Sequence, residues 1–532
     1  MYFNEKILVG KNEEKEAYII PKMANRHGII SGASGSGKTI TLKVLAESFS
    51  DARVPVFLVD VKGDLAGTAL RGVMNSNIES RIEKLNLTDY ELKKYPTTFW
   101  DVYGEYGHPI RTTVKKVGPK LLSKMLDLSD AQEGVLTIAF KIAEDEDLDL
   151  TDLKDLRTLL NYIGDKKKDY SLSYGNITTQ SIGTIQRNIL SLQEEGGDYF
   201  FGKPDFEIKD FIHYDGDTGN GQINILHAST LFQKPNLYST FLLWLLTYLY
   251  NSMPEVGDLN KPKLVFFIDE AHLLFDNIPK SLLTSITQIV KLIRSKGVGL
   301  YFISQSPSDI PDEILSQLGN RIQHVLRYYT KNDEKSIKAA ANSFRMNPKL
   351  DTVEEIKNLG TGVALVSFQD EKGNPEMVEK VTILPPQSAM GAIEDDLREE
   401  LIRRSYLYGK YETKVDDESA FEKIEKVKDE EEKKKQEEKE RIEEQKQKEL
   451  EEKEAEKKRK EEEKLQKEEE KRKKEAEKEA ERKRKEEEKK KKEEEKAKQN
   501  TVGYKLGKKV VNKTTNKIID KSLNKILKNF FK

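Results

Sequence analysis

The segment "IISGASGSGKTITL", residues 29–42, gives the strongest indication of the fold of this chain. Its core, "GASGSGKT", lies between an apolar run and a helical pattern and fits G-x-x-x-x-G-K-[ST]. In such a loop, backbone amides close around a phosphate at a helix N-terminus. Lys38 is then expected to reach the β- and γ-phosphates of ATP, and Thr39 to offer its hydroxyl to Mg²⁺. The predicted cradle consists of Gly32, Ala33, Ser34, Gly35, Ser36, Gly37, Lys38 and Thr39.

A second motif bears on hydrolysis. In "KLVFFIDEAH", residues 263–272, an apolar strand is followed by two carboxylates. Asp269 is predicted to hold the magnesium ion, and Glu270 to activate the attacking water. An acidic strand end that faces solvent is the alternative, and the phosphate-binding loop elsewhere in the chain argues against it.

Two further strand ends carry polar residues. "LYFISQSP" ends in Gln305, which is expected to sense the γ-phosphate or to orient water. "VDVKGD", residues 59–64, places Asp60 at the carboxyl end of another strand, where ligands of open α/β sheets bind. A turn built by residues 62–64 is the alternative explanation of "VDVKGD", and the two explanations are compatible.

Charge that develops on a transferred phosphoryl group is often stabilised by an arginine from a neighbouring subunit. Arg294 in "IVKLIRSKGVGL" and Arg321 in "GNRIQHVLR" are candidates. Spacing alone does not choose between them. Each is equally explained as a surface arginine or as one that contacts nucleic acid.

Up to about residue 390, apolar β-rich runs alternate with helical patterns, which predicts an α/β fold with a largely parallel sheet. Continuous hydrophobicity in the strands indicates that helices cover both faces. Amphipathic patterns such as residues 118–164 predict a helical insertion over about 115–215. The clearest predicted strands are residues 27–31, 54–61, 263–270 and 297–305.

Composition narrows the setting. The 532 residues include no cysteine, which excludes disulfides and cysteine-ligated metals and fits a reducing, cytoplasmic location. The first 20 residues mix charge into every short apolar patch and do not resemble a secretion signal. The apolar run 237–250 has 14 residues, fewer than the roughly 20 that span a bilayer. We therefore expect a buried core helix there.

The net charge of −2 conceals a partition along the chain. Residues 1–420 carry 50 basic and 60 acidic side chains, whereas 64 of the 80 residues in 421–500 are charged, 32 of each sign. Without an apolar heptad seam, these 80 residues favour a solvated single helix held by side-chain pairs, roughly 120 Å long. A disordered charged linker is the alternative, and either structure would act as a spacer.

The last segment, 501–532, carries nine lysines and one aspartate. Within 508–532 the lysines recur every three or four residues, and Ile519, Leu523, Ile526 and Phe530 form an apolar row. This pattern predicts a basic amphipathic helix for a membrane surface, nucleic acid or an acidic partner. A solvated tail is the alternative.

Several long motifs together resemble the HerA-like ATPases, in the helicase HerA-like C-terminal branch of the FtsK/HerA P-loop motors. They are "GASGSGKT", "VPVFLVDVKGDLAG", "FWDVYGEYGHPIRTTV", "IQRNILSLQEEGGDYFFG", "LVFFIDEAHLLF", "KLIRSKGVG", "LGNRIQHVLR" and "GVALVSFQDEKGNP". The similarity runs from about residue 5 to about residue 400. It implies a RecA-like core assembled as a homohexameric ring, ATP hydrolysis between subunits, and translocation on double-stranded DNA.

The resemblance also implies residue roles. Lys38 and Thr39 match the P-loop pair, Asp269 and Glu270 the acidic pair, and Gln305 the sensor. Arg294 resembles the arginine finger that acts on the neighbouring subunit's nucleotide, and Arg26 resembles a second nucleotide-facing arginine. Classical HerA proteins open with a small β-barrel before the motor. Here Lys38 comes so early that we expect this barrel to be missing.

The sequence thus predicts a motor domain over 1–400, a charged single-helix or coiled-coil-like spacer over 401–500, and a basic amphipathic tail over 501–532. The leading hypothesis is a ring-forming ATPase that moves duplex DNA, although a net charge of −10 over residues 1–420 gives no general attraction to phosphates. A membrane-tethered coupling or pump ATPase, peripheral to the membrane, is the second hypothesis. A nucleotide-regulated scaffold with slow turnover is the third. A nuclease or a membrane surface is the partner considered for the tail.

Overall fold

The computed structural model describes residues 1–276 and 278–496, with the side chains of the last helix described as far as Lys489. The chain divides into two compact units, of which the first is Met1–Glu430 and the second begins at Glu431. The basic amphipathic tail predicted over 501–532, and with it the predicted membrane or nuclease contact, lies outside the described residues.

A mixed sheet organises the first unit, with 13 strands in the described residues. Its central part is parallel and runs in the order β11-β4-β10-β9-β5-β8-β6-β7. The four strands that the sequence predicts most clearly are β4, β5, β9 and β10, and all four lie here, buried along their length. The bounds are β4 Gly28–Ser31, β5 Val56–Asp60, β6 Thr97–Asp101, β7 His108–Pro109, β8 Ile223–His227, β9 Leu264–Ile268, β10 Val298–Ser304 and β11 Asn320–Gln323.

An antiparallel flank extends the sheet beyond β11, and the sequence analysis did not anticipate it. β12 pairs with β11, β13 with β12, and β2 with β13, while β1 and β3 both pair with β2. The predicted largely parallel sheet is therefore mixed. The bounds are β1 Tyr2–Phe3, β2 Lys6–Lys11, β3 Glu16–Ile19, β12 Val363–Ser367 and β13 Glu379–Ile383.

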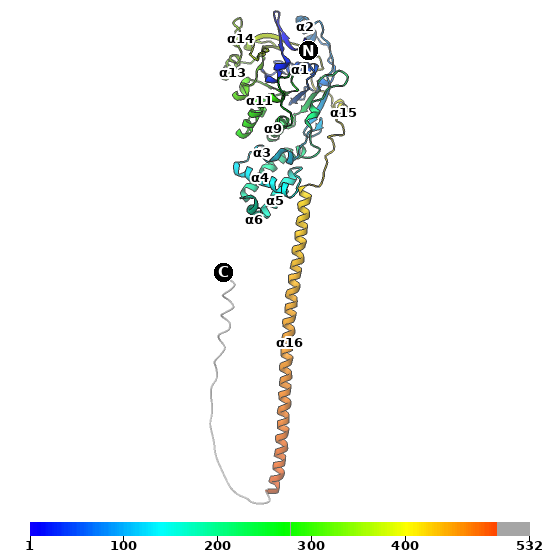
Figure 1. The fold of residues 1–532 in the computed structure, drawn as a ribbon, viewed down its shortest axis with the longest axis vertical. Helices are drawn as coiled ribbons and strands as arrows, with labels where there is room; N and C mark the ends of the chain where they lie inside the picture. Colours follow the sequence, from blue (N-terminus) through cyan, green and yellow to red (C-terminus); the bar gives the residue numbers. More distant parts are fainter. Residues whose placement is uncertain (277, 497–532) are drawn as a thin grey trace. The chain divides into compact units, whose positions relative to one another are not determined.

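Helices cover both faces of the sheet, as continuous strand hydrophobicity predicts (Figure 1). One buried cluster contains α1 (Lys38–Asp51), and the other contains α9 (Pro235–Ser252) and α11 (Lys280–Leu292). Helix α9 holds the apolar run 237–250 and buries 11 of its 18 residues, so the predicted core helix is confirmed. No helix in the described part of the chain combines the length and apolarity needed to cross a membrane.

A helical insertion occupies the chain between β7 and β8 and gathers into one group, most visibly α3 to α6 (Figure 1). Polar caps fix where its helices begin: Thr113 caps α3, and Asp152 with Asp155 forms a capping box on α5. Its helices are α3 Val114–Met125, α4 Asp130–Asp145, α5 Leu153–Asp165, α6 Lys167–Tyr174, α7 Thr179–Glu194 and α8 Gly197–Phe200.

Shorter helices complete the first unit. They are α2 Ser76–Lys84, α10 His272–Phe275, α12 Asp312–Leu315, α13 Lys331–Asn342, α14 Thr352–Asn358 and α15 Asp395–Arg403, with the 3-10 helices η1 Pro21–Arg26, η2 Ala66–Ala69, η3 Ile208–Phe211, η4 Leu231–Gln233, η5 Ile293–Lys296 and η6 Pro307–Asp309. η1 and η5 precede β4 and β10 respectively, which matters for the site described below.

The charged segment forms one long helix, α16 (Ala420–Lys496), which confirms the predicted long charged helix. Its 77 residues correspond to a length of about 115 Å. Glu-to-Lys pairs four residues apart support it along its exposed surface, such as Glu456 with Lys460 at 2.7 Å and Glu463 with Lys467 at 2.8 Å. The first turn is different, because Ala420 and Ile424 are buried in the core of the first unit.

Candidate nucleotide-binding site

The loop between β4 and α1 has the geometry of an anion cradle. Gly35 and Gly37 have φ of +73° and +110°, a region that side chains disfavour. The amides of Ser34, Gly35, Gly37, Lys38 and Thr39 make no hydrogen bond to protein groups within the described chain. The loop is nevertheless held in place, since Ala33 N donates to Val325 O at 2.8 Å and Gly362 N to Ser36 O at 3.0 Å. Free amides at a helix N-terminus fit a phosphate.

Lys38 lies in the cradle with its side chain folded back. Its Nζ donates to the carbonyl oxygens of Gly32 at 2.6 Å and Ala33 at 3.2 Å. Burial lowers the pKa of Lys38, and the negative charge of Glu270 acts in the opposite direction. A phosphate in the cradle would offer the ammonium a charged partner in place of two neutral carbonyls.

The acidic pair lies at the same edge of the sheet. β10 separates the two strands, with Ile303 opposite Ile30 of β4 and Phe302 opposite Ile268 of β9. Two strand spacings put Asp269 roughly 10 Å from the start of the cradle. Asp269 Oδ1 accepts a hydrogen bond from the Glu270 amide at 2.9 Å, whereas its buried Oδ2 has no hydrogen-bond partner among the described residues.

The pKa values of the two carboxylates are shifted in opposite directions. Burial, the largest effect, raises the pKa of Asp269 to about 7. Burial also opposes ionisation of Glu270, but the hydrogen bond and charge of Lys62 outweigh it and leave its pKa below the ordinary value. Lys62 Nζ lies 2.6 Å from Glu270 Oε1. Glu270 has a φ of +46°, a left-handed conformation that is uncommon for a residue with a side chain.

The other two predicted strand-end residues differ in their surroundings. Gln305 follows β10, the strand between the cradle and the acidic pair, and its side chain is exposed. Asp60 is buried, and its carboxylate accepts from the amides of Gly63 at 2.7 Å and Leu65 at 3.0 Å. Asp60 therefore braces the turn after β5, and this turn is compatible with the predicted place of Asp60 beside the nucleotide. Burial raises its pKa to about 6.

His324 supports the cradle and was missed by the sequence analysis. Its Nδ1 lies 3.1 Å from Val363 O, and its Nε2 lies 2.8 Å from Thr41 Oγ1. Donation from Nδ1 to the carbonyl leaves Nε2 to accept from the hydroxyl. A Cβ on Gly32 would lie 2.5 Å from His324 Cβ, so the loop needs a glycine there. Burial lowers the pKa of His324 to about 4, which keeps the imidazole neutral.

The candidate arginines separate into two kinds. Arg321 donates to the carbonyls of Leu318 and Leu315, both at 3.1 Å, and thus braces its own loop. Arg294 in η5 is exposed and makes no side-chain hydrogen bond or ion pair with the described residues. Partial desolvation and the nearby charge of Arg26 lower the pKa of Arg294, and the charge of Asp258 acts in the opposite direction. Arg26 and Arg294 therefore lie close together, before β4 and β10.

These two arginines lie at the edge of the sheet opposite the cradle. β10 is seven residues long, so its two ends are roughly 20 Å apart. That distance exceeds the reach of an arginine side chain. Arg26 and Arg294 thus cannot contact a phosphate held by Lys38 of the same chain.

The residues present fit a magnesium–nucleoside triphosphate. The cradle provides free amides and an ammonium for phosphate oxygens. Asp269 provides a carboxylate oxygen to which no described residue donates a hydrogen bond, and carboxylate oxygens are the type of ligand that Mg²⁺ prefers. Thr39 is the second residue of α1. These assignments remain predictions.

The phosphate cradle on β4 and the acidic pair on β9, with β10 between them, define the class: a RecA-like P-loop nucleotide-binding fold. A family model, helicase HerA-like C-terminal, matches residues 5–529. The chain belongs to this helicase HerA-like family.

The individual relatives of this chain have low sequence identity to it. The chain is 26% identical over 376 residues to the DNA double-strand break repair helicase HerA of Sulfurisphaera tokodaii, covering 68% of this chain and 66% of that protein. It is 23% identical over 362 residues to HerA of Saccharolobus solfataricus, covering 68% and 64%. The chain therefore spans about two thirds of the length of these relatives. Among solved structures, the bacterial conjugative coupling protein TrwB is 14% identical with a TM-score of 0.49, over 73% of this chain and 91% of TrwB.

Proposed function

We propose that this protein is an ATPase that works as a ring-shaped motor on double-stranded DNA. The observation that carries the proposal is that the candidate residues lie at opposite ends of the parallel strands, which form two opposite edges of the sheet. One edge gathers the phosphate cradle, Lys38 and the acidic pair, and the other presents Arg26 and Arg294. The membership of the HerA-like family and the DNA repair helicases among its relatives support the DNA substrate.

At the first edge, the cradle amides and Lys38 bind the phosphates of ATP. Thr39 and Asp269 would hold Mg²⁺, which would supply positive charge to the phosphate oxygens. Glu270 accepts the proton of the attacking water, and Gln305 orients that water from the end of β10. These roles follow from the shared edge of the sheet and from the family resemblance.

The second edge serves the neighbouring subunit. Because Arg26 and Arg294 cannot reach the phosphates bound by their own chain, we infer that they complete the site of an adjacent copy. One copy's cradle edge would meet the next copy's arginine edge, a head-to-tail contact that closes into a ring. The family resemblance gives six subunits.

The DNA substrate is tested by the rate of ATP hydrolysis of the full chain with and without linear double-stranded DNA, together with its mass in solution. We expect DNA to stimulate hydrolysis and the mass to correspond to a ring. Hydrolysis indifferent to DNA would contradict the translocase. Liposome flotation of the full chain against a chain ending at residue 500 then tests the membrane-tethered alternative.

Two variants test the chemistry itself. Lys38→Ala should abolish binding of ATP, because the free amides alone do not balance the phosphate charge. Glu270→Gln should bind ATP and fail to hydrolyse it, since an amide is not a base. A Glu270→Gln protein that still hydrolyses ATP would show that another residue activates the water.

A further inference from the structure

The direction in which a triphosphate lies across the cradle follows from the order of the strands. The acidic pair and Gln305 lie on the β10–β9 side of β4, so the γ-phosphate points that way. The α-phosphate and the nucleoside must then leave on the opposite side, toward β11 and β12. This step rests on the proposed function, because it assumes that Lys38 and Glu270 share one nucleotide.

A groove of about 490 Å³ opens on that side, next to the cradle. Its volume falls within the roughly 300–1,000 Å³ of small-molecule sites. Gly37 and Ile40, from the end of the cradle and the first turn of α1, form one end. Other lining residues come from α2, from the loop before β12 and from the segment after β13, and include Ile78, Arg81, Gly362 and Met390.

Arg81 joins these walls to one another. Its guanidinium donates to the carbonyls of Thr361 at 3.3 Å, Gly362 at 3.2 Å and Ile383 at 3.0 Å. A Cβ on Gly362 would lie 2.3 Å from Arg81 Nη1, so a glycine is needed for this contact. α2 is thereby fixed against the loop that bonds to Ser36 of the cradle.

Many polar backbone groups along the groove already have partners. Arg81 occupies the carbonyls of Thr361 and Gly362, and the Gly362 amide bonds to Ser36. Pro385 and Pro386 have no amide hydrogen, and Tyr90 donates to the carbonyl of Pro386 at 2.6 Å. The polar side chains of α2 and its cap that line the groove, Asn75, Asn77, Ser80 and Lys84, are exposed to water, so a hydrogen bond from one of them to a base would only replace a hydrogen bond to water. Few buried polar groups line the groove that could read the hydrogen-bonding edge of a base.

We propose that this groove binds the nucleoside of the triphosphate, and that it does so by contact with aliphatic side chains such as Ile40, Ile78 and Met390 rather than by buried hydrogen bonds to the base. A site rejects the wrong substrate strongly when that substrate leaves buried polar groups of the site unpaired. A site that binds by apolar contact has few such groups and therefore imposes little penalty. The groove therefore distinguishes adenine from guanine weakly.

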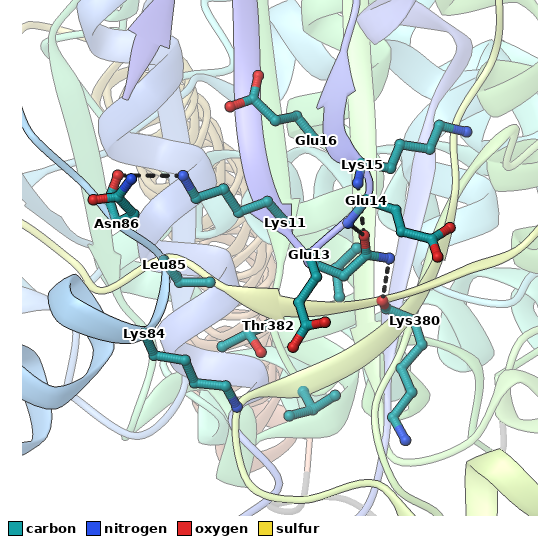
Figure 2. Close-up of a pocket in the computed structure, with 13 residues that line it drawn as sticks. Lys11, Glu13, Glu14, Lys15, Glu16, Lys84, Leu85, Asn86, Lys380 and Thr382 are labelled. Atoms are coloured by element: carbon teal, nitrogen blue, oxygen red, sulfur yellow. Dashed lines mark hydrogen bonds between the residues drawn. The ribbon is translucent and has the colours of Figure 1, made fainter.

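A neighbouring cavity of about 760 Å³ does not compete for this role. It lies around the β2–β3 turn, and Figure 2 shows lysines and glutamates along its lining. Lys11 Nζ donates to Asn86 O at 3.4 Å, and Asn12 Nδ2 donates to Lys380 O at 2.9 Å. No residue of the cradle lines it. Lys84, Val363 and Thr382 line both cavities, so the nucleoside groove ends where this charged cavity begins.

The test compares three ligands, each with Mg²⁺: ATP, GTP and inorganic tripolyphosphate, which has no nucleoside. Ser80→Trp fills the groove from the exposed face of α2. Glu83→Trp places the same side chain on the same helix outside the groove and is the matched control. Met390→Trp fills the groove from its other wall, at a residue whose side chain is 52% exposed.

We expect both groove variants to weaken the binding of ATP and GTP by at least about tenfold. Their affinity for tripolyphosphate should stay within about twofold of the wild type, which would also show that the variants fold. Glu83→Trp should change none of the three. In the wild type, the dissociation constants of ATP and GTP should agree within about tenfold.

Unchanged ATP affinity in Ser80→Trp and Met390→Trp would overturn the location of the nucleoside, and a preference for ATP over GTP of more than about a hundredfold would overturn binding by contact. Both results leave the proposed function standing. If Lys38→Ala leaves the affinity for tripolyphosphate unchanged, the phosphate cradle itself is wrong.

Discussion

Lys62 and Glu270 form an ion pair across two neighbouring strands, with 2.6 Å between Nζ and Oε1. Lys62 follows β5, and β5 flanks β9 on the side away from β10 and the cradle. The lysine therefore approaches the proposed base from the β5 side, and its charge also acts on Lys38. It also lowers the pKa of Glu270 against the effect of burial, so it makes the carboxylate a weaker base.

Removing the charge of Lys62 should make Glu270 a stronger base. We expect Lys62→Met to raise the rate of ATP hydrolysis without DNA by roughly two- to tenfold, and to move the acidic limb of the pH–rate profile to higher pH. Lys62→Arg keeps the charge and should behave as the wild type does. A fall in kcat at unchanged KM in Lys62→Met would instead give Lys62 a part in the reaction itself.

Arg294 should act on the neighbouring subunit's nucleotide. Arg294→Ala should reduce kcat by about 10³-fold or more while ATP still binds, because it removes charge that opposes the developing negative charge of the phosphoryl group. Arg321→Ala should instead lower thermal stability, since Arg321 braces the carbonyls of Leu315 and Leu318.

Mixing inactive subunits tests whether Arg294 acts between chains. Arg294→Ala and Lys38→Ala proteins each lack one half of every site. In a ring assembled from equal amounts, about a quarter of the interfaces should pair an intact cradle with an intact arginine and recover hydrolysis. If subunits exchange and no activity returns, Arg294 does not act in trans.

Sequence patterns were sufficient for the elements whose signal is local. β4, β5, β9 and β10 are continuous apolar runs buried on both faces, and α16 follows from charged helix formers without an apolar seam. The antiparallel flank was missed for a physical reason. β13 alternates between buried and partly exposed residues, and it pairs with β2, some 370 positions earlier in the chain, through only two residue pairs.

At the site, too, the sequence predicted some features and missed others. The motifs predicted which residues approach the phosphates, because those residues end neighbouring parallel strands. The Lys62–Glu270 pair and the role of His324 depend on how far side chains reach between strands, which no spacing reveals. The closeness of Arg26 and Arg294 arises because β4 and β10 are parallel and paired in register, so their preceding turns meet.

The buried His324 should make the protein sensitive to acid. Its folded pKa of about 4 lies below its ordinary value of 6.5, so the unfolded chain takes up a proton that the folded chain refuses between these pH values. Stability from this group is complete above about pH 6.5 and is lost as the pH falls toward 4. The difference between the folded and the ordinary pKa corresponds to about 3 kcal/mol of the free energy of unfolding.

Thermal melts between pH 4 and 8 measure this loss. His324→Asn keeps a donor for Val363 O and cannot titrate, so its melting temperature should fall less steeply over the same range. The comparison uses the slope, since the substitution also alters packing at every pH. Equal slopes in the two proteins would mean that His324 is not a source of the acid sensitivity.

Asp155 should anchor the base of the long helix. One oxygen accepts from the amides of Thr151 and Asp152, and the other accepts from the Phe421 amide at 2.9 Å and from the Ser419 hydroxyl. A single buried carboxylate thus caps both α5 and the start of α16. Asp155→Ala leaves these donors without a partner and should destabilise the first unit by about 2–3 kcal/mol.

Hydrogen exchange locates the effect, because amides 419–424 should exchange faster in Asp155→Ala while the exposed middle of α16 is unchanged. Asp149→Ala is the matched control: it removes a nearby, half-exposed ion pair with Lys115, the kind that adds little stability. If both variants left exchange at 419–424 as it is in the wild type, the buried apolar contacts of Ala420 and Ile424 would be enough to hold the helix, and Asp155 would not be its anchor.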